Sequence, residues 1–192
     1  MERMRLFVAV DLDAPMRERL RRLSAELRHA TGDRLKATWV RADRMHLTLH
    51  FLGEVGDDLV PAVAAAVEAP VAVSPFDVEV AGVGLFPSAE RPRVLWAGLR
   101  AGVAELVRVH AVMTERLAPL GIALDPRPFT PHLTLARIKG RVAPRASQAI
   151  AVCAGRAVGR CRVEAAMLYR SVLGEGGPTY TSLARAAFTG DA

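Results

Sequence analysis

The sequence predicts a mixed fold of strands and helices, built from two similar halves that face each other across a cleft. Two observations support this prediction. The tetrapeptide His-Leu-Thr-Leu occurs twice, at residues 46–49 and 132–135. Each copy also follows an apolar strand and a helix-like segment, at nearly the same spacing from Arg5 in the first half and from Arg93 in the second. Such an internal repeat is typical of two related structural units.

Both copies of the tetrapeptide alternate polar and apolar residues, as a half-buried strand does. Side chains on a strand alternate between its two faces, so the leucines would enter a core. His46 and Thr48 would then face an opening, together with His132 and Thr134. A single copy would suit an ordinary surface strand. Because the chain has only five histidines, two identical copies favour a functional role.

The first helix is the element whose limits the sequence marks most clearly. Asp13 is a typical N-cap, Pro15 is tolerated in the first turn, and Gly32 ends the segment. Apolar residues at helical spacing form its buried stripe: Met16, Leu20, Leu23 and Leu27. A later helix has the same pattern, and His110 in its stripe is interpreted as a half-buried residue and not as a catalyst.

Alternating patterns and turn residues place the other elements. Asp57 or Asp58 fits the N-cap of a second helix. The residues from Phe188 to the end are expected to fray. The expected strands are residues 4–12, 36–41, 46–53, 74–83, 93–99, 132–139, 160–165 and 180–185, and the further expected helices are 57–67, 103–117 and 144–154.

The chain is basic, with a formal net charge of +6 over 192 residues. A basic chain favours anionic partners such as nucleic acid. Arginine supplies nearly all of this charge, since Lys36 and Lys139 are the only lysines. A GC-rich coding sequence would produce the same bias, so both explanations stay open.

The cysteines and the apolar runs of the sequence indicate the cellular compartment in which the protein is expected. Cys153 and Cys161 match neither a zinc spacing nor a redox motif, so we expect free thiols in a reducing compartment. The apolar run near the N-terminus is too short for a signal peptide, and no run approaches the length of a membrane span. We therefore expect a cytoplasmic protein with no membrane association.

Paired histidines can carry out acid–base chemistry at phosphorus. A neutral imidazole can take a proton from water, and a charged one can give a proton to a leaving oxygen. Displacement at phosphorus places the attacking and leaving oxygens on opposite sides, which two histidines on opposed strands match. Thr48 and Thr134 would direct hydroxyls at the non-bridging oxygens. This chemistry needs no metal and no cofactor.

A metal site is the alternative interpretation of the same histidines. His46 and His50 would share one strand face, and imidazole suits zinc or copper, with His132 as a third ligand. The second copy has Ala136 where the first has His50, so the repeat preserves His and Thr and not His and His.

The chain resembles the 2H phosphoesterase superfamily, and within it the RNA 2′,3′-cyclic phosphodiesterases, also called 2′-5′ RNA ligases. The resemblance rests on the paired His-Leu-Thr-Leu motifs, on Phe7 within residues 5–11 (RLFVAVD), on residues 51–54 (FLGE) and 131–137 (PHLTLAR), and on segments 84–93 and 168–171. It implies an α+β fold with two pseudo-two-fold related lobes of antiparallel sheet, with flanking helices around a central cleft. It also implies a single domain spanning residues 1–192.

The resemblance implies metal-independent hydrolysis of RNA 2′,3′-cyclic phosphate ends to 2′-phosphates. Joining of tRNA halves through a 2′-5′ bond is attributed to relatives, so tRNA fragments are further expected partners. His46 maps onto the proton donor to the departing 3′ oxygen and His132 onto the base for water. Thr48 and Thr134 map onto phosphate contacts. A monomer is expected. The alternative function is that of a non-catalytic module that binds a nucleotide or RNA without turning it over.

Two further residues receive roles from the resemblance. Arg137 matches an arginine that stacks on the nucleobase. Phe7 would form the other side of that sandwich, although plain core packing explains Phe7 equally well.

Overall fold

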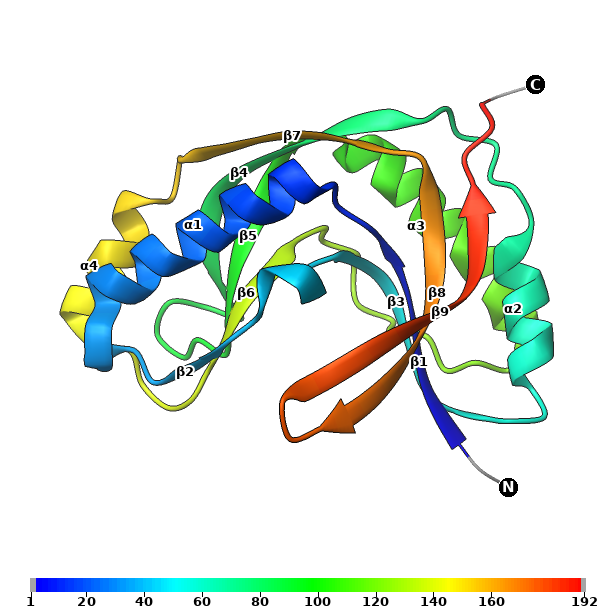
Figure 1. The fold of residues 1–192 in the computed structure, drawn as a ribbon, viewed down its shortest axis with the longest axis horizontal. Coiled ribbons are helices and arrows are strands. Elements are labelled where there is room, and N and C mark those ends of the chain that lie inside the picture. Colours follow the sequence, from blue (N-terminus) through cyan, green and yellow to red (C-terminus); the bar gives the residue numbers. More distant parts are fainter. Residues whose placement is uncertain (1–2, 191–192) are drawn as a thin grey trace.

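The computed structural model describes residues 3–190, which form one curled antiparallel sheet flanked by helices (Figure 1). The strand order is β7-β4-β5-β6-β3-β1-β8-β9, and the short β2 pairs with β6. The strands are β1 (Arg3–Val10), β2 (Ala37–Trp39), β3 (Leu47–Gly56), β4 (Phe76–Phe86), β5 (Val94–Ala101), β6 (Leu133–Ile138), β7 (Ala157–Val163), β8 (Ala165–Gly174) and β9 (Gly177–Ala187). The helices are α1 (Ala14–Thr31), α2 (Val60–Glu68), α3 (Val103–Leu117) and α4 (Pro144–Val152).

Within residues 3–190, the two halves of the sheet meet at a single residue pair between β3 and β6. Leu47 of β3 lies opposite Leu133 of β6, and both side chains are fully buried. The strand order is symmetric about this junction, because β3-β1-β8-β9 on one side matches β6-β5-β4-β7 on the other. The α+β fold of two related lobes predicted from the sequence is confirmed. The lobes share one continuous sheet.

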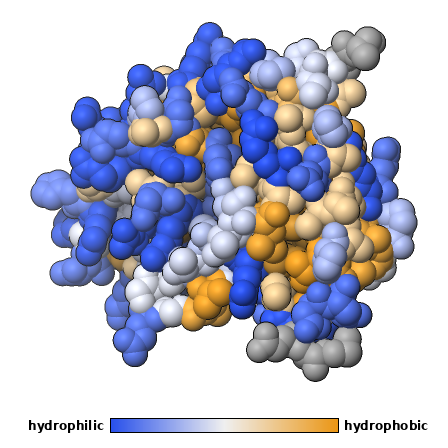
Figure 2. Space-filling model, turned by 45° about the vertical axis from the view of Figure 1, so that its right-hand side comes forward, coloured by the Kyte–Doolittle hydropathy of each residue, from blue (hydrophilic) through white to orange (hydrophobic). Residues whose placement is uncertain are grey.

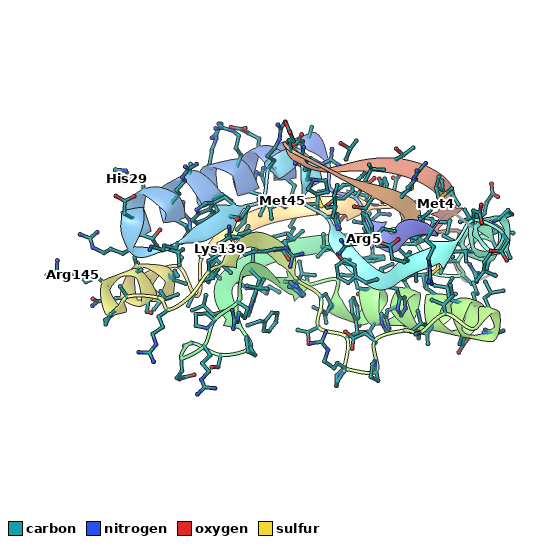
Figure 3. All side chains as sticks on the ribbon, turned by 90° about the horizontal axis from the view of Figure 1, so that it is seen from below. Met4, Arg5, His29, Met45, Lys139 and Arg145 are labelled. Carbon is teal, nitrogen blue, oxygen red and sulfur yellow. The ribbon has the colours of Figure 1, made fainter. Side chains whose placement is uncertain are left out.

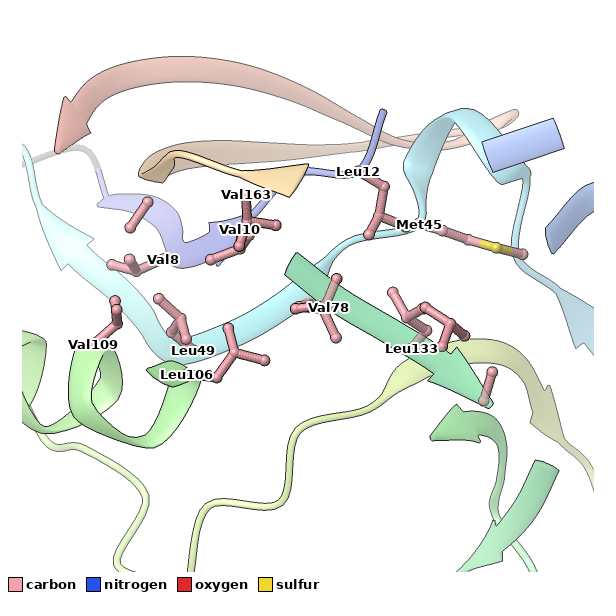
Figure 4. Packing of buried hydrophobic residues seen from close by; sticks show 14 of the residues in the cluster. Val8, Val10, Leu12, Met45, Leu49, Val78, Leu106, Val109, Leu133 and Val163 are labelled. Carbon is pink, nitrogen blue, oxygen red and sulfur yellow. The ribbon is translucent and has the colours of Figure 1, made fainter. Parts of the chain in front are cut away.

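The helices of the repeat cross from one half to the other. Helix α1 follows β1 in the chain yet packs against α4 and β7 of the opposite half. Helix α3 follows β5 yet packs against β3 and α2 (Figure 1). Close to the junction, Leu106 and Val109 of α3 lie beside Leu49 (Figure 4). The crossing therefore closes one core around both half-sheets.

Helix α1 has the limits that the sequence predicts. The Asp13 carboxylate accepts a hydrogen bond of 2.7 Å from the backbone N–H of Met16, and Gly32 ends the helix with a φ of 51°. The predicted apolar stripe is buried: Met16, Leu20, Leu23 and Leu27.

The predicted cap of α2 is wrong. Strand β3 continues to Gly56, so Asp57 and Asp58 belong to the turn after it. The Asp57 carboxylate accepts a hydrogen bond from the backbone N–H of Asp58, and the helix begins at Val60 without a side-chain cap.

The sequence predicts only part of the C-terminal hairpin, and the prediction that the chain frays from Phe188 is wrong. Strands β8 and β9 form a long pair that ends at Gly174 and Gly177. Their outer residues alternate weakly because this part of the hairpin is exposed, so the pattern marked only a part of β9. Phe188 is 5% exposed, and its ring stacks on Phe76 at 5.7 Å. Residues 191 and 192 lie outside the described residues.

Surface composition differs between the two sides of the molecule. On the face in Figure 2, hydrophilic residues gather on one side, whereas hydrophobic residues gather on the other. Within residues 3–190, no helix is both long and apolar enough to cross a membrane.

Leu47 and Leu133 should each contribute strongly to the free energy of unfolding. Leu133→Ala leaves a cavity where only one residue pair joins the half-sheets, so the free energy of unfolding should fall by about 2–5 kcal/mol. Urea denaturation followed by circular dichroism measures this change. The matched control is Leu173→Ala, because Leu173 is 67% exposed and its loss should change stability by about 0.5 kcal/mol or less. Equal effects of the two substitutions would contradict the role of the junction.

Candidate active site

The junction places the two predicted histidines on one face of the sheet. Leu47 and Leu133 point into the core, so alternation turns His46, Thr48 and their counterparts to the opposite, partly exposed face. In an antiparallel pair, the residue before one leucine lies beside the residue after the other. His46 therefore lies on the side of Thr134, and His132 lies on the side of Thr48. The structure brings all four predicted catalytic residues together.

Both imidazoles are held in the same way. The Nδ1 atom of His46 lies 2.9 Å from the carbonyl oxygen of Arg44, and that of His132 lies 2.8 Å from the carbonyl oxygen of Thr130. A carbonyl oxygen only accepts, so Nδ1 must carry the proton in each ring. In the neutral ring, Nε2 then keeps its lone pair for a proton of the substrate or of water.

The surroundings of the two rings differ. His46 stacks on Phe7 at 4.7 Å and meets the edge of Tyr180 at 5.4 Å, whereas His132 meets the edge of Phe86 at 5.1 Å. Burial lowers the pKa of His46 to about 4, and the Arg44 carbonyl opposes that shift only partly. His46 is therefore neutral in the free protein at neutral pH. A bound anion beside the ring would raise its pKa.

A cavity of about 780 Å³ opens at His46. His46, Thr48, Thr134 and Arg137 line it, whereas His132 does not. Residues 174–177 of the β8–β9 turn and three more arginines also line it: Arg5, Arg41 and Arg44. In the view from below (Figure 3), Met45 of the cavity wall lies between Arg5 of one half and Lys139 of the other. A cavity of this size fits a nucleotide-sized ligand.

A β-bulge changes the predicted orientation of His50. The register between β1 and β3 pairs Val8 with His50 but Ala9 with Thr48, so Leu49 is an extra residue. Leu49 and His50 are consequently both buried. His50 Nε2 lies 3.1 Å from the His110 carbonyl oxygen, to which it donates. The prediction that His50 faces the same way as His46 is wrong, because the bulge resets the alternation.

The same bulge occurs in β6 and directs Arg137 to the cavity. There Ala136 pairs with Leu95 and Thr134 pairs with Trp96, which leaves Leu135 as the extra residue. Arg137 is exposed and lines the cavity. Its equivalent in the first half is Phe51, which is 58% exposed and lines the same cavity.

Phe51 was not predicted as a site residue. Two signals for it are in the sequence: its place in the segment 51–54, and its position five residues after His46, which matches that of Arg137 after His132.

Phe7 lies beneath the histidine and not at the open surface. Phe7 is 4% exposed, and its ring stacks on His46 and on Tyr169, the latter at 5.3 Å, although the residue also lines the cavity. Tyr169 in turn donates a hydrogen bond of 2.6 Å to Asp11. Phe7 therefore supports the ring of His46, and its place in a base sandwich stays a prediction.

The ligand set of the metal alternative is not brought together. His50 is engaged by the His110 carbonyl and by Thr114, on the side of the strand that α3 covers. In the part of the chain that the structure describes, no three His, Cys, Asp or Glu side chains are grouped as metal ligands.

A curled sheet with paired His-x-Thr strands at its centre defines a phosphoesterase of the two-histidine class. The family model described as LigT like Phosphoesterase matches residues 10–96 and 99–180, so the chain belongs to this family.

Similar proteins cover nearly the whole chain. An Archaeoglobus fulgidus protein named RNA 2′,3′-cyclic phosphodiesterase is 36% identical, over 94% of this chain and 98% of its own length. One of the same name from Aeropyrum pernix is 34% identical, over 86% and 92%. The crystal structure of E. coli LigT complexed with 3′-AMP has a TM-score of 0.78 at 28% identity, over 98% of this chain and 99% of that chain.

The buried histidines should make stability depend on pH. Burial lowers the pKa of His46 and His110 to about 4, and it also lowers the pKa of His50. In the unfolded chain these three residues take up protons near pH 6.5, whereas in the folded protein they do so only at lower pH. Their stabilising contribution is therefore present above about pH 6.5 and is lost as the pH falls towards 4.

His110→Phe keeps an aromatic ring next to Phe129, which stacks on His110 at 4.3 Å, but it cannot titrate. Urea denaturation at pH 7.5, 6.0 and 4.5 should show a shallower loss of stability for His110→Phe than for the wild type. The same loss in both proteins would contradict a low pKa for His110.

Proposed function

We propose that this protein hydrolyses the 2′,3′-cyclic phosphate ends of RNA to 2′-phosphates by acid–base catalysis between His46 and His132, without a metal. The observation that carries the proposal is the matched pair of imidazoles, each fixed through Nδ1 by a backbone carbonyl, with Nε2 left for proton transfer. The names of the relatives and the 3′-AMP complex of the E. coli structure support this substrate class.

The position of the cavity supports the division of roles. The leaving 3′ oxygen belongs to the ribose, and the rest of the RNA needs room on that side. The cavity lies at His46, whereas His132 is outside its lining. Because the attacking and leaving oxygens lie on opposite sides of phosphorus, the water approaches from the side of His132. His46 is then the proton donor and His132 the proton acceptor.

The reaction balances with these two residues and water. His132 Nε2 takes a proton as the water oxygen bonds to phosphorus. The bond from phosphorus to O3′ breaks, and O3′ receives a proton from His46 Nε2. Thr48 and Thr134 donate hydrogen bonds to the non-bridging oxygens, where negative charge increases. A 2′-phosphate and a free 3′-hydroxyl result.

His46 must gain its proton before it can donate one. Its low pKa keeps it neutral in the free protein. The cyclic phosphate carries a negative charge, and an anion next to a buried imidazole favours the charged ring. Binding of the substrate therefore favours the protonated form of His46, which can then act as the proton donor.

Arg137 is the proposed base-stacking residue. Its guanidinium is exposed at the cavity, where it can lie flat on a nucleobase. Phe51 exposes more of its ring than Phe7 does, so it is the better-placed aromatic partner.

The 2′-5′ ligase activity, tRNA fragments as substrates, a monomeric state, a cytoplasmic location and a single domain over residues 1–192 stay predictions.

One assay separates the proposed enzyme from its alternatives. Purified protein should hydrolyse a 2′,3′-cyclic mononucleotide at the same rate with and without EDTA, and phosphorus NMR should identify the product as a 2′-phosphate. A rate abolished by EDTA would restore the metal alternative. Specific binding without turnover would indicate a nucleotide-binding module.

A leaving-group comparison assigns the two histidines. A ribose oxygen leaves poorly without a proton, whereas a nitrophenolate leaves well. His46→Ala should therefore lose roughly 10²–10⁴-fold in kcat on the cyclic phosphate, but much less on a nitrophenyl phosphodiester. His132→Ala should be impaired on both, because water still needs a base.

Circular dichroism must first show that each variant is folded. Rescue of His132→Ala by the nitrophenyl substrate, with no rescue of His46→Ala, would reverse the two roles.

A further inference from the structure

The cavity continues as a basic surface along β2 and the end of β6. Thr38 of β2 lies opposite Arg137 of β6, and both line the cavity. Beyond this pair, the backbone N–H of Lys139 donates a hydrogen bond of 2.7 Å to the carbonyl oxygen of Lys36. Alternation puts the two lysines on the same face as Thr38 and Arg137, about 7 Å further along the strands. Ile138, on the other face, is buried.

Three of the side chains on this face are cations. Lys36, Arg137 and Lys139 are exposed, and within residues 3–190 none of them forms an ion pair with a carboxylate. Several arginines elsewhere on the surface are neutralised by carboxylates: Arg21, Arg22, Arg127, Arg156 and Arg160. The only two lysines of the chain thus lie side by side, next to the cavity, with their charge available.

We propose that Lys36 and Lys139 bind backbone phosphates of the RNA strand on the 5′ side of its cyclic end. The preferred substrate is then an oligonucleotide and not a cyclic mononucleotide. This inference rests on the proposed function, since the cyclic end must occupy the cavity for the preceding phosphates to reach the lysines.

Continuity with the cavity favours a nucleic acid over an acidic protein. A strand whose last nucleotide is held by Arg137 must leave the cavity along one of its walls. The wall made by β2 and β6 offers positive charges two residues beyond Arg137 along the strands. These charges are ammonium groups on long flexible side chains, which bind phosphate as point charges. Each phosphate that the lysines neutralise releases counterions, so the contact should be sensitive to salt.

The experiment measures binding and turnover separately. Fluorescence anisotropy compares a mononucleotide and a tetranucleotide of one sequence, both with a 2′-phosphate end, which the protein does not turn over. The test variant is Lys36→Ala/Lys139→Ala. The matched control is Arg28→Ala/Arg108→Ala, which removes two exposed charges from α1 and α3, outside the lining of the cavity. Turnover of a 2′,3′-cyclic mononucleotide by the same proteins tests the proposed function by itself.

The wild type should bind the tetranucleotide more tightly than the mononucleotide at low salt. The lysine variant should lose roughly 10-fold in affinity for the tetranucleotide, and its salt slope should be shallower by about 1.4, as expected for two lost contacts to a single strand. Its affinity for the mononucleotide and its turnover of the cyclic mononucleotide should stay within about twofold of the wild type. The control variant should match the wild type throughout.

Three results would overturn the inference: equal affinity of the wild type for both lengths, equal losses in the lysine and control variants, or competition by polyglutamate as strong as that by RNA. The last result would indicate a general anion surface. Absence of turnover with intact length-dependent binding would overturn the proposed function and not the lysine contact.

Discussion

The pairing of Leu47 with Leu133 is the contact on which the site depends. Among the described residues it is the single residue pair between β3 and β6, and each leucine is preceded by a histidine and followed by a threonine. Burial of both leucines fixes the direction of their neighbours, because alternation leaves only the opposite face for His46 and His132. The same packing that closes the core therefore assembles the site. Helices α1 and α3 each pack against the opposite half, and these contacts also keep the two halves together.

The sequence predicts the parts of the fold that local pattern controls. The cap and apolar stripe of α1 depend on residues close together in the chain, and the structure has them where expected. The two His-Leu-Thr-Leu strands were found because their alternation is strict. Their relation across the junction was suggested by the repeat, and not by the pattern of either strand.

Non-local features account for what the sequence did not predict. The bulges at Leu49 and Leu135 come from pairing with β1 and β5, and no residue in the strand itself marks them. Because of these bulges, His50 is buried, and Phe51 and Arg137 line the cavity. The outer part of the hairpin of β8 and β9 is also stabilised by non-local backbone pairing and not by an apolar face, so the sequence pattern does not mark it.

The central claim is that the imidazole of His46 is neutral and protonated on Nδ1 in the free protein, and that an anion at the cavity charges it. Nitrogen-15 NMR of the histidine rings, recorded near pH 6 with and without a nucleoside 2′-phosphate, measures this directly. The free protein should show the His46 ring neutral with its proton on Nδ1, and this ring should become doubly protonated when the 2′-phosphate binds. A His46 ring that carries its proton on Nε2, or that stays neutral in the complex, would contradict the account.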